Sequence, residues 1–333
     1  MRALSVVLFL LLAGCAGALR QGAETAPDAY RQGQIDGDGF VSFDGARLGL
    51  QSWLPPESVN GGKPKAVIAG LHGMGDYSET FYLAGPWWAE QGIATYAYDQ
   101  RGFGRSPRRG VWPEQEVMMA DVAYFVAALR AEYPDTPVIL VGVSMGGAAS
   151  LAAFGSATPP DVDGLVLVSP AVWGWSQMNP LYSIALRLAT AVAPGWSPTG
   201  ESLNRWPSDN IEMLRKLGRD PLMVRATRID AVYGLVELME AGWRTRAGRD
   251  VPALILMGQN DQIVPPGVIE RYAERQSPEA CFKTYPAGYH MLLRDLQAEN
   301  VWRDIAGFIG GNCPAPATAA LSAEDGTGAP ARR

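Results

Sequence analysis

The sequence predicts an α/β fold in which a mostly parallel, doubly wound sheet carries helices on both faces. Three observations support it: short apolar runs alternate with helix-length segments, several runs are apolar at every position, and the segments between them have helical spacing. A continuous apolar run is typical of a strand buried on both faces. Residues 114–133, for example, carry apolar side chains at helical spacing and stop before Pro134. Such alternation is characteristic of doubly wound sheets.

The composition limits the domain number and excludes several functions. The chain has 333 residues, 47% of them hydrophobic, which is enough for one large domain or two small ones. Lys and Arg number 28 against 34 Asp and Glu, so the net charge is −6 and a nucleic-acid partner is not expected. The two histidines (His72, His290) and three cysteines (Cys15, Cys281, Cys313) do not have zinc-finger or iron–sulfur spacing, and we expect no metal.

The first fourteen residues have the layout of a signal peptide. Arg2 precedes an apolar run over 6–12, which is too short for a membrane-spanning helix of about 20 residues. The tetrapeptide Leu-Ala-Gly-Cys at 12–15 resembles the lipobox of bacterial lipoproteins, in which the cysteine is lipidated and becomes the first residue. We therefore expect Cys15 to anchor the protein to a membrane of the bacterial cell envelope, on its periplasmic or outer face.

Residues 15–35 are small and polar, and we interpret them as a tether between this anchor and the fold. The core is expected to begin at residue 36. The stretch GFVSFDGARLGLQSWLP, which begins at Gly39, has the pattern of an antiparallel hairpin that turns at Asp44-Gly45.

Two stretches, 36–170 and 250–313, are expected to form the sheet and its helices. The apolar runs interpreted as buried strands are 66–73, 94–100, 137–144, 164–170 and 252–259. Residues 314–333 are rich in Ala, Pro, Gly and Ser, and we expect them to be disordered.

Residues 171–249 interrupt the alternation, because they contain helix-forming stretches and five tryptophans but no clear strand. We interpret this segment as a helical cap inserted between two strands. Residues 180–192 carry an apolar stripe at helical spacing, which either packs on the core or lines a substrate groove.

The last two cysteines are placed to form a disulfide. Cys281 opens the strand-like stretch CFKTYP, and Cys313 follows the helix-like stretch 297–309. If that strand and that helix run antiparallel to each other, both cysteines lie at the same end of the sheet. Because an exported protein meets an oxidising compartment, we predict that they pair.

The string VILVGVSMGG at 138–147 contains Gly-x-Ser-x-Gly, the pattern of a nucleophile elbow. A buried strand leads into it, and a helix of small residues at 148–154 leads out. Glycines are needed because the turn is tight and its backbone approaches its neighbours closely. The turn places the hydroxyl of Ser144 at the carboxyl end of the sheet, where open α/β sheets bind their ligands.

A serine hydroxyl attacks only when a base takes its proton, so the base is His72 or His290. His72 directly follows the first buried strand, a position that shapes the oxyanion hole in many hydrolases. His290 lies late, between a strand and the last helix, and the order Ser, acid, His is a known triad order. We predict that His290 is the base.

The acid should follow the strand 252–259, where the chain supplies Asp261. It would hold the imidazole tautomer and stabilise the imidazolium. Asp230 and Asp295 are alternative carboxylates, but neither follows a buried strand.

An oxyanion hole requires two backbone N–H groups. Met145, the residue after the nucleophile, supplies one. The loop after His72 supplies the other, which we assign to Met74.

Taken together, these motifs resemble the monoacylglycerol lipase and lysophospholipase group of α/β hydrolases, which is also grouped under the serine aminopeptidase name. The resemblance covers residues 36–310 and rests on the strings HGMGDYSETF, DQRGFGRS, GVSMGG, NDQIVPP and GYHMLLRD, with RDPL at 219–222. It implies an α/β-hydrolase fold with an inserted helical cap that lines an acyl-chain groove. It also implies the same roles for Ser144, Asp261, His290, Met74 and Met145. Relatives usually have histidine at the place of Gln100, a turn that we interpret as structural.

The resulting hypothesis is a membrane-tethered serine hydrolase that cleaves a lipid ester such as a monoacylglycerol or lysophospholipid, without a cofactor. An aminopeptidase is the first alternative, and it would need acidic side chains in the cap, for which Glu237 and Glu240 are candidates. The second alternative is a non-catalytic, lipid-binding lipoprotein on a hydrolase fold.

Overall fold

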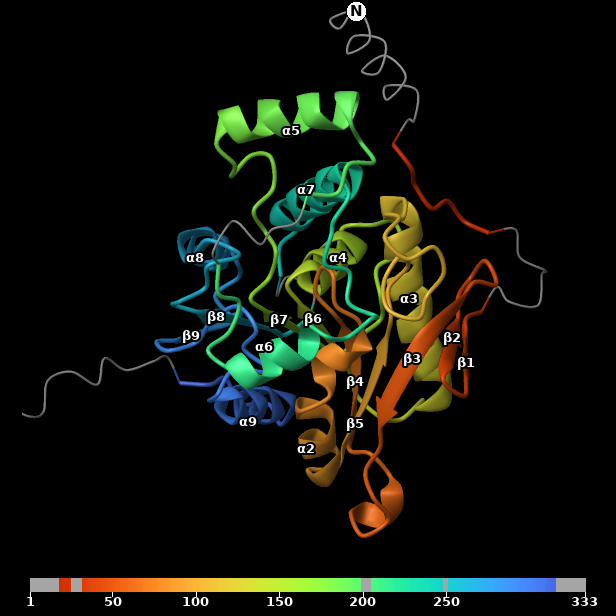
Figure 1. The fold of residues 1–333 in the computed structure, drawn as a ribbon. Helices are drawn as coiled ribbons and strands as arrows, with labels where there is room; N and C mark the ends of the chain where they lie inside the picture. Colours follow the sequence, from red (N-terminus) through yellow and green to blue (C-terminus); the bar gives the residue numbers. More distant parts are fainter. Residues whose placement is uncertain (1–17, 25–31, 199–204, 248–250, 316–333) are drawn as a thin grey trace, which may run out of the picture.

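The computed structural model describes residues 18–24, 32–198, 205–247 and 251–315. Across these residues nine strands form one sheet in the order β1-β2-β3-β5-β4-β6-β7-β8-β9 (Figure 1). The strands are β1 (Gln34–Asp36), β2 (Gly39–Val41), β3 (Arg47–Trp53), β4 (Ala66–Leu71), β5 (Ile93–Tyr98), β6 (Val138–Val143), β7 (Gly164–Val168), β8 (Ala253–Gly258) and β9 (Cys281–Tyr285).

Strands β4 to β9 are parallel to one another, whereas β1, β2 and β3 pair antiparallel. Every residue of β4, β5, β6, β7 and β8 is buried, which explains why these strands are continuously apolar in the sequence. The prediction of a mostly parallel, doubly wound α/β sheet is confirmed.

Helices cover both faces of the sheet, and each face has its own hydrophobic core. On one face the core includes side chains of α3, α4, α7 and α8, and on the other those of α2 and α9 (Figure 1). The helices are α2 (Ala84–Glu90), α3 (Gln115–Glu132), α4 (Met145–Phe154), α5 (Pro180–Val192), α6 (Ile211–Leu217), α7 (Ile229–Arg244), α8 (Pro266–Glu274) and α9 (Ala298–Ile309), with short 3₁₀ turns η2 (Asn60–Gly62) and η3 (Ser78–Phe81).

The expected hairpin is present, because β2 and β3 pair with Gly39 opposite Gly49 and Val41 opposite Arg47. Its turn includes Asp44 and Gly45 as predicted, and Gly45 has a φ of 82°. Sequence reasoning missed β1, a three-residue strand that precedes this hairpin and pairs with β2.

Within the predicted tether over 15–35, the residues that the structure describes make contacts with the rest of the fold. Gln21 is buried and pairs as an isolated bridge with Pro113, while Glu24 N donates to Asp44 Oδ2 at 2.7 Å. Strand β1 also starts inside this range, at Gln34. These residues lie on the fold because their amides find acceptors there, which polarity alone does not reveal.

Three helices, α5, α6 and α7, lie between β7 and β8 in the described part of residues 171–249. Helix α7 packs against α4, and α5 lies on the outer side of α7 (Figure 1). The predicted signal peptide at 1–14 and the predicted lipidation site Cys15 lie outside the described residues, as does the tail beyond residue 315. None of the described helices has the length and apolar character that crossing a membrane requires.

Candidate active site

Ser144 occupies the sharp turn between β6 and α4. Its φ of 52° and ψ of −113° lie outside the regions that a side chain normally permits. The neighbouring helix position requires glycine, because a Cβ on Gly146 would clash with the carbonyl oxygen of Leu71 at the end of β4. Ser144 N donates to the carbonyl of Val168 at 2.9 Å, which fixes the turn to β7. Strand, turn and helix together hold the hydroxyl at the carboxyl edge of the sheet.

The structure brings Ser144, His290 and Asp261 into one chain of hydrogen bonds. Ser144 Oγ lies 2.9 Å from His290 Nε2, and His290 Nδ1 lies 2.7 Å from Asp261 Oδ2. All three side chains are buried, and they follow β6, β9 and β8 respectively. This arrangement lets the imidazole accept the serine proton while the carboxylate stabilises the resulting charge.

Asp261 is oriented by its own loop. Its Oδ1 accepts hydrogen bonds from the backbone N–H groups of Ile263 at 2.8 Å and Val264 at 2.9 Å. Its Oδ2 therefore remains directed at His290. The turn after β8 thus positions the carboxylate before any substrate arrives.

The two alternative carboxylates have other partners. Asp295 accepts from Ser208 Oγ at 2.6 Å and from Tyr289 N at 2.7 Å, so it supports the loop that carries His290. Burial raises the pKa of Asp295. Asp230 lies at the start of α7, where Arg228 contacts it.

His72 is fully buried and has a structural position. Its Nδ1 donates to the carbonyl of Gly73 at 2.8 Å, its Nε2 accepts from Gln100 N at 2.8 Å, and Gln100 Nε2 donates to the carbonyl of His72 at 2.9 Å. Burial lowers the pKa of His72, so its neutral form is favoured. Gln100 therefore ties the loop after β4 to the loop after β5.

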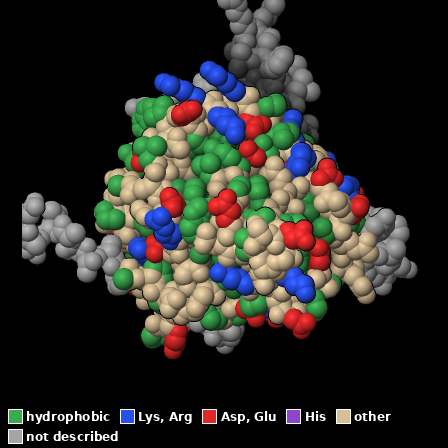
Figure 2. All heavy atoms as spheres, turned by 90° about the horizontal axis from the view of Figure 1, so that it is seen from below, with side chains coloured by type: hydrophobic (Ala, Val, Ile, Leu, Met, Phe, Trp, Pro, Cys, Tyr) green, Lys and Arg blue, Asp and Glu red, His purple; other side chains and the backbone are tan. Residues whose placement is uncertain are grey.

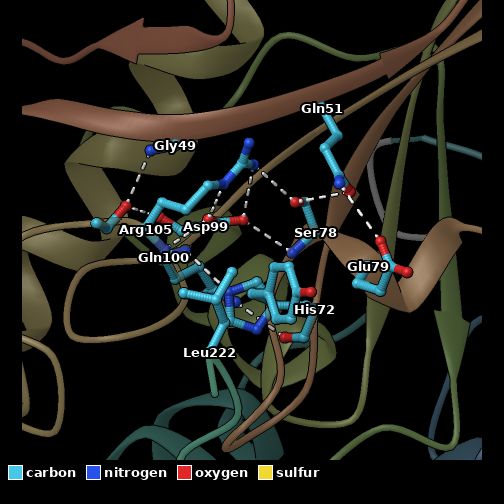
Figure 3. Close-up of polar contacts among 12 residues, drawn as sticks. Gly49, Gln51, His72, Ser78, Glu79, Asp99, Gln100, Arg105 and Leu222 are labelled. Carbon is cyan, nitrogen blue, oxygen red and sulfur yellow. Dashed lines mark hydrogen bonds and ion pairs between the residues drawn. The ribbon is translucent and has the colours of Figure 1, made fainter. Parts of the chain in front are cut away.

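A buried carboxylate completes this connection. Asp99 accepts hydrogen bonds from Ser78 N at 2.9 Å and from the backbone and guanidinium of Arg105 at 2.8 and 2.9 Å. Figure 3 shows that Ser78 and Arg105 approach Asp99 beside the His72–Gln100 contact. The DQRGFGRS turn thus supports the loop that contains Met74.

The predicted oxyanion donors flank the serine. Met145 is the first residue of α4, and the first N–H groups of a helix have no partner within it. Met74 lines the same pocket as Ser144 and His290. Gly75 in this loop accepts a hydrogen bond from Val224 N of the cap at 2.8 Å. The cap therefore helps to position the loop that is predicted to supply the second oxyanion donor.

A cavity of about 190 Å³ opens beside the triad. Its lining is mainly apolar, from Gly73, Met74, Val143, Pro207, Met223, Ile263, Met291 and Leu293. Larger cavities of about 640 and 770 Å³ elsewhere contain no residue of the triad. The small, mainly apolar cavity is therefore the candidate substrate site.

Sequence reasoning missed a polar group in this cavity, formed by Asp76, Thr80 and Arg294. Arg294 Nη2 pairs with Asp76 Oδ2, which also accepts from Thr80 Oγ1 at 2.9 Å. Arg294 Nη1 is buried and has no hydrogen-bond partner within the structure. Asp76 and Arg294 both occur in the quoted motifs, but their contact exists only once the loops after β4 and before α9 meet.

The two cap carboxylates considered for the aminopeptidase, Glu237 and Glu240, lie outside this cavity. Glu240 accepts from Ser176 N and Ser176 Oγ, both at 2.9 Å, and from Arg244 Nε at 2.9 Å. Glu237 lies 3.9 Å from Arg20. Neither side chain lines the cavity beside Ser144, so neither is placed to hold a substrate ammonium.

Cys281 and Cys313 form a disulfide, with their Cα atoms 5.7 Å apart. The bond joins the start of β9 to the segment after α9.

Over the described ranges, no group of three or more His, Cys, Asp or Glu side chains is arranged to bind a metal ion.

A family model described as serine aminopeptidase, S33 (Hydrolase_4) matches residues 62–297, well over half of the chain. The chain belongs to this family. The match includes Ser144, Asp261 and His290, so the S33 family region contains the whole hydrogen-bonded triad.

Relatives of this S33 member include lipases. The monoacylglycerol lipase of Mycolicibacterium smegmatis is 24% identical, over 81% of this chain and 95% of its own length. The mouse monoglyceride lipase is 29% identical, over 77% of this chain and 84% of its own. The predicted resemblance to the monoacylglycerol lipase group, and the prediction of a serine hydrolase, are confirmed.

Solved structures agree on the fold. A soluble variant of the Saccharomyces cerevisiae monoglyceride lipase, in complex with a substrate analogue, superposes with a TM-score of 0.66 at 20% identity. The likeness covers 82% of this chain and 94% of the yeast one. The monoacylglycerol lipase of Paleococcus ferrophilus gives a TM-score of 0.61 at 22% identity, over 79% of this chain and 98% of its own.

Proposed function

We propose that this protein is a membrane-anchored serine hydrolase that cleaves carboxylic esters of lipids, such as a monoacylglycerol or a lysophospholipid. The observation that carries the proposal is the continuous hydrogen-bonded chain from Asp261 through His290 to Ser144, at the wall of a mainly apolar cavity. The family membership and the lipases among its relatives support the same reaction.

In this mechanism Ser144 Oγ attacks the ester carbonyl while its proton passes to His290 Nε2. The imidazolium that forms is stabilised by Asp261, and the oxyanion by the backbone N–H groups of Met74 and Met145. The tetrahedral intermediate then expels the alcohol, which takes the proton from His290. Water, deprotonated by the same imidazole, attacks the acyl-serine and releases the fatty acid.

The lining of the cavity favours an amphiphilic substrate. Its apolar residues suit an acyl chain, whereas Thr80 and Arg294 can donate to hydroxyl or phosphate oxygens of a head group and Asp76 can accept from a hydroxyl. The free N–H groups of Arg294 Nη1 are donors and need an acceptor oxygen. A glycerol or phosphate head group supplies such oxygens.

The name of the family favours the alternative of an aminopeptidase. That reaction needs a carboxylate free to bind the substrate's ammonium. Asp76, the acid that lines the cavity, already accepts from Tyr77 N, Thr80 and Arg294. Since Glu237 and Glu240 lie elsewhere, the structure favours the ester.

Lipidation of Cys15 is the basis for the proposed anchoring in the bacterial cell envelope, and it rests on the sequence Leu12–Cys15. Several acyl chains on one cysteine give stable membrane association, at about 0.8 kcal/mol for each buried methylene. Mass spectrometry of the protein extracted from membranes tests this part directly.

Labelling with a fluorophosphonate tests the chemistry. The wild type should be labelled, and Ser144→Ala should lose both the label and at least about a thousandfold of the ester hydrolysis rate. Ser156→Ala, a serine after the end of α4 that is not part of the triad, is the matched control and should retain both. An unlabelled wild type would instead favour the non-catalytic lipid-binding lipoprotein.

Substrate comparison separates the ester from the peptide bond. We expect hydrolysis of a monoacylglycerol or nitrophenyl ester to exceed that of an aminoacyl nitroanilide by orders of magnitude in kcat/KM. Equal or greater cleavage of the anilide would support the aminopeptidase.

A further inference from the structure

Residues 18–24, which we call the N-terminal strap, are bonded to the loop before α3, residues 99–114. Gln21 N donates to Trp112 O at 2.9 Å, and Glu114 N donates to Gln21 O at 2.8 Å. Gln21 is only 3% exposed. In Figure 1 the strap is the red segment at the upper right, above β1 and β2. Its main chain therefore forms part of the fold.

The side chain of Gln21 makes two hydrogen bonds that require an amide. Its Nε2 donates to the carbonyls of Val111 at 2.6 Å and Arg108 at 3.3 Å. The amide packs closely against Gly102, where a Cβ would lie 3.2 Å from Nε2. An ionised glutamate of the same size has no donor and would direct a negative charge at two carbonyl oxygens. The surroundings of this side chain therefore favour glutamine over glutamate.

The other end of the strap is bonded to the cap. Leu19 N donates to Asp230 Oδ2 at 3.0 Å, and Arg20 donates to the carbonyl of Asp230 at 2.8 Å. Asp230, at the start of α7, is fully buried. Helix α7 also packs directly on the loop before α3, since a Cβ on Gly234 would meet Trp112 Nε1 at 2.3 Å. The strap thus joins the cap to the loop before α3, two parts that contact each other.

Both parts contact the loop that contains Met74. Phe103, from the loop before α3, lies edge-on to the ring of His72, with the ring centroids 5.5 Å apart. On the cap side, Val224 N donates to Gly75 O at 2.8 Å.

Little free space separates these three parts. The space between them measures only about 10 Å³, which is at most the room for one water molecule. Its lining comes from all three and includes Met74, Phe103, Trp112, Val224 and Ala231. Because side chains packed this closely transmit displacements, a shift of the loop before α3 or of the cap moves the loop that contains Met74.

We propose that Gln21 is a positioning residue for ester hydrolysis. It acts through Trp112 and the cap to hold the loop whose Met74 N–H stabilises the oxyanion. This inference rests on the proposed function, because it requires the oxyanion role of Met74. Gln21 does not line the cavity beside the triad, so its replacement should lower kcat for every ester and leave KM nearly unchanged. Loss of one oxyanion donor lowers kcat about 10²–10³-fold, and a displaced donor loses part of that.

Gln21→Glu in the full chain tests the proposal. Titration to completion with a fluorophosphonate gives the concentration of competent enzyme, so kcat is expressed per titrated site and unfolded protein does not contribute. We expect kcat for a short nitrophenyl ester and for a monoacylglycerol to fall about tenfold, with KM changed less than about twofold. A trifluoromethyl ketone forms an adduct with Ser144 that carries an oxyanion, so its Ki should also rise about tenfold.

Leu19→Pro tests the other end of the strap without altering a buried side chain. Proline lacks the N–H that donates to Asp230, and Leu19 is 46% exposed, so we expect this variant to fold. Its kcat per titrated site should fall about threefold, in the same direction as that of Gln21→Glu, with KM unchanged.

Gln91→Glu is the matched control, because it makes the same substitution at an exposed glutamine at the end of α2. Helix α2 lies in the lower part of the ribbon in Figure 1. The face seen from below carries Lys, Arg, Asp and Glu side chains scattered among apolar ones (Figure 2). One more carboxylate there should leave kcat and Ki at their wild-type values.

The outcomes distinguish this inference from the proposed function. If the wild type hydrolyses esters and Gln21→Glu keeps the wild-type kcat and Ki per titrated site, the strap only stabilises the fold and the inference alone is overturned. A rise in KM without a fall in kcat overturns it as well. If Gln21→Glu yields no folded protein, the kcat and Ki of Leu19→Pro decide in the same way. A wild type that takes no label and hydrolyses no ester overturns the proposed function, and this inference with it.

Discussion

At the scale of single residues, Asp99 supports the loops beneath the site through several hydrogen bonds. Its side chain is fully buried, and it joins Ser78 and Arg105 across two loops. Although burial opposes ionisation, the hydrogen bonds from Arg105 and Ser78 outweigh it and lower the pKa of Asp99 from its ordinary value of 3.8. The folded state therefore stabilises the ionised form of Asp99.

This predicts a pH-dependent effect of Asp99→Asn. Because the folded-state pKa is lowered, the stabilisation is complete above pH 4 and disappears as the pH falls through the lowered value. We expect the variant to lose about 2 kcal/mol of unfolding free energy at pH 7 and less at pH 3. Urea unfolding at pH 7, 5 and 3 measures the difference, and a loss independent of pH would contradict it.

Arg294 gives a second prediction at this scale. Arg294→Lys keeps a cation beside Asp76 but removes the second group of donors that the unpartnered Nη1 provides. We expect KM for a monoacylglycerol to rise about tenfold, since a hydrogen bond to a charged group is lost, while KM for the methyl ester of the same fatty acid stays unchanged. An equal rise for both esters would mean that Arg294 only supports the fold.

The sequence was sufficient to predict Ser144, Asp261 and His290 as neighbours, because each follows a strand and parallel strands end at one edge. It was not sufficient for Asp76 and Arg294. Their pairing depends on how two loops fold over the sheet edge, and no local pattern encodes that approach. The same limit applies to Gln100, whose contact with His72 crosses between the loops after β4 and β5.

Among the elements, the turn from β6 into α4 depends most on its glycines, and Gly146 gives a test. A methyl group there would clash with Leu71 O and approach His72 O, both of them backbone atoms that cannot rotate away. We expect Gly146→Ala to cost about 3 kcal/mol and to reduce activity at least about tenfold, since the oxyanion loop must shift.

Gly307 in α9 is the matched control, because a Cβ there meets nothing within 4 Å. Gly307→Ala should leave activity unchanged and raise the unfolding free energy by about 0.5–1 kcal/mol through helix propensity. Thermal unfolding and ester hydrolysis of both variants measure the contrast. If the two substitutions had the same effect, close backbone approach at Gly146 would not be the reason for its glycine.

Elements with strong local patterns were predictable, and weak ones were not. The buried strands have continuous apolar runs, and the hairpin has a clear turn sequence. Strand β1 has only three residues, all of them exposed or partly exposed, so it leaves no pattern in the sequence. For α5, the apolar stripe was visible in the sequence, but its exposure in the structure was not, because the sequence pattern does not say which face of the helix turns toward α7.

At the scale of the whole molecule, the N-terminal segment and the last strand of the sheet are held on the fold in different ways. The N-terminal segment was expected to be a tether, yet Gln21 is buried in it. The C-terminal part is held by a covalent bond, the disulfide between Cys281 and Cys313. Strand β9 is the edge of the sheet and pairs with β8 alone, so α9 and the disulfide hold the last strand in place.

Removing this bond should destabilise the whole protein. Cys281 and Cys313 are 32 residues apart, and in the chain-entropy model a loop of that size stabilises by about 3–4 kcal/mol. We expect the double variant C281A/C313A to lose about 3 kcal/mol of unfolding free energy in urea, and the reduced wild type to lose a similar amount. The triad lies on loops after β6, β8 and β9. We therefore expect the double variant to hydrolyse esters at temperatures low enough for β9 to remain paired with β8. If C281A/C313A were as stable as the oxidised wild type, packing of α9 alone would hold the edge strand. As a control, reductant should not change the stability of C281A/C313A, because it lacks this disulfide.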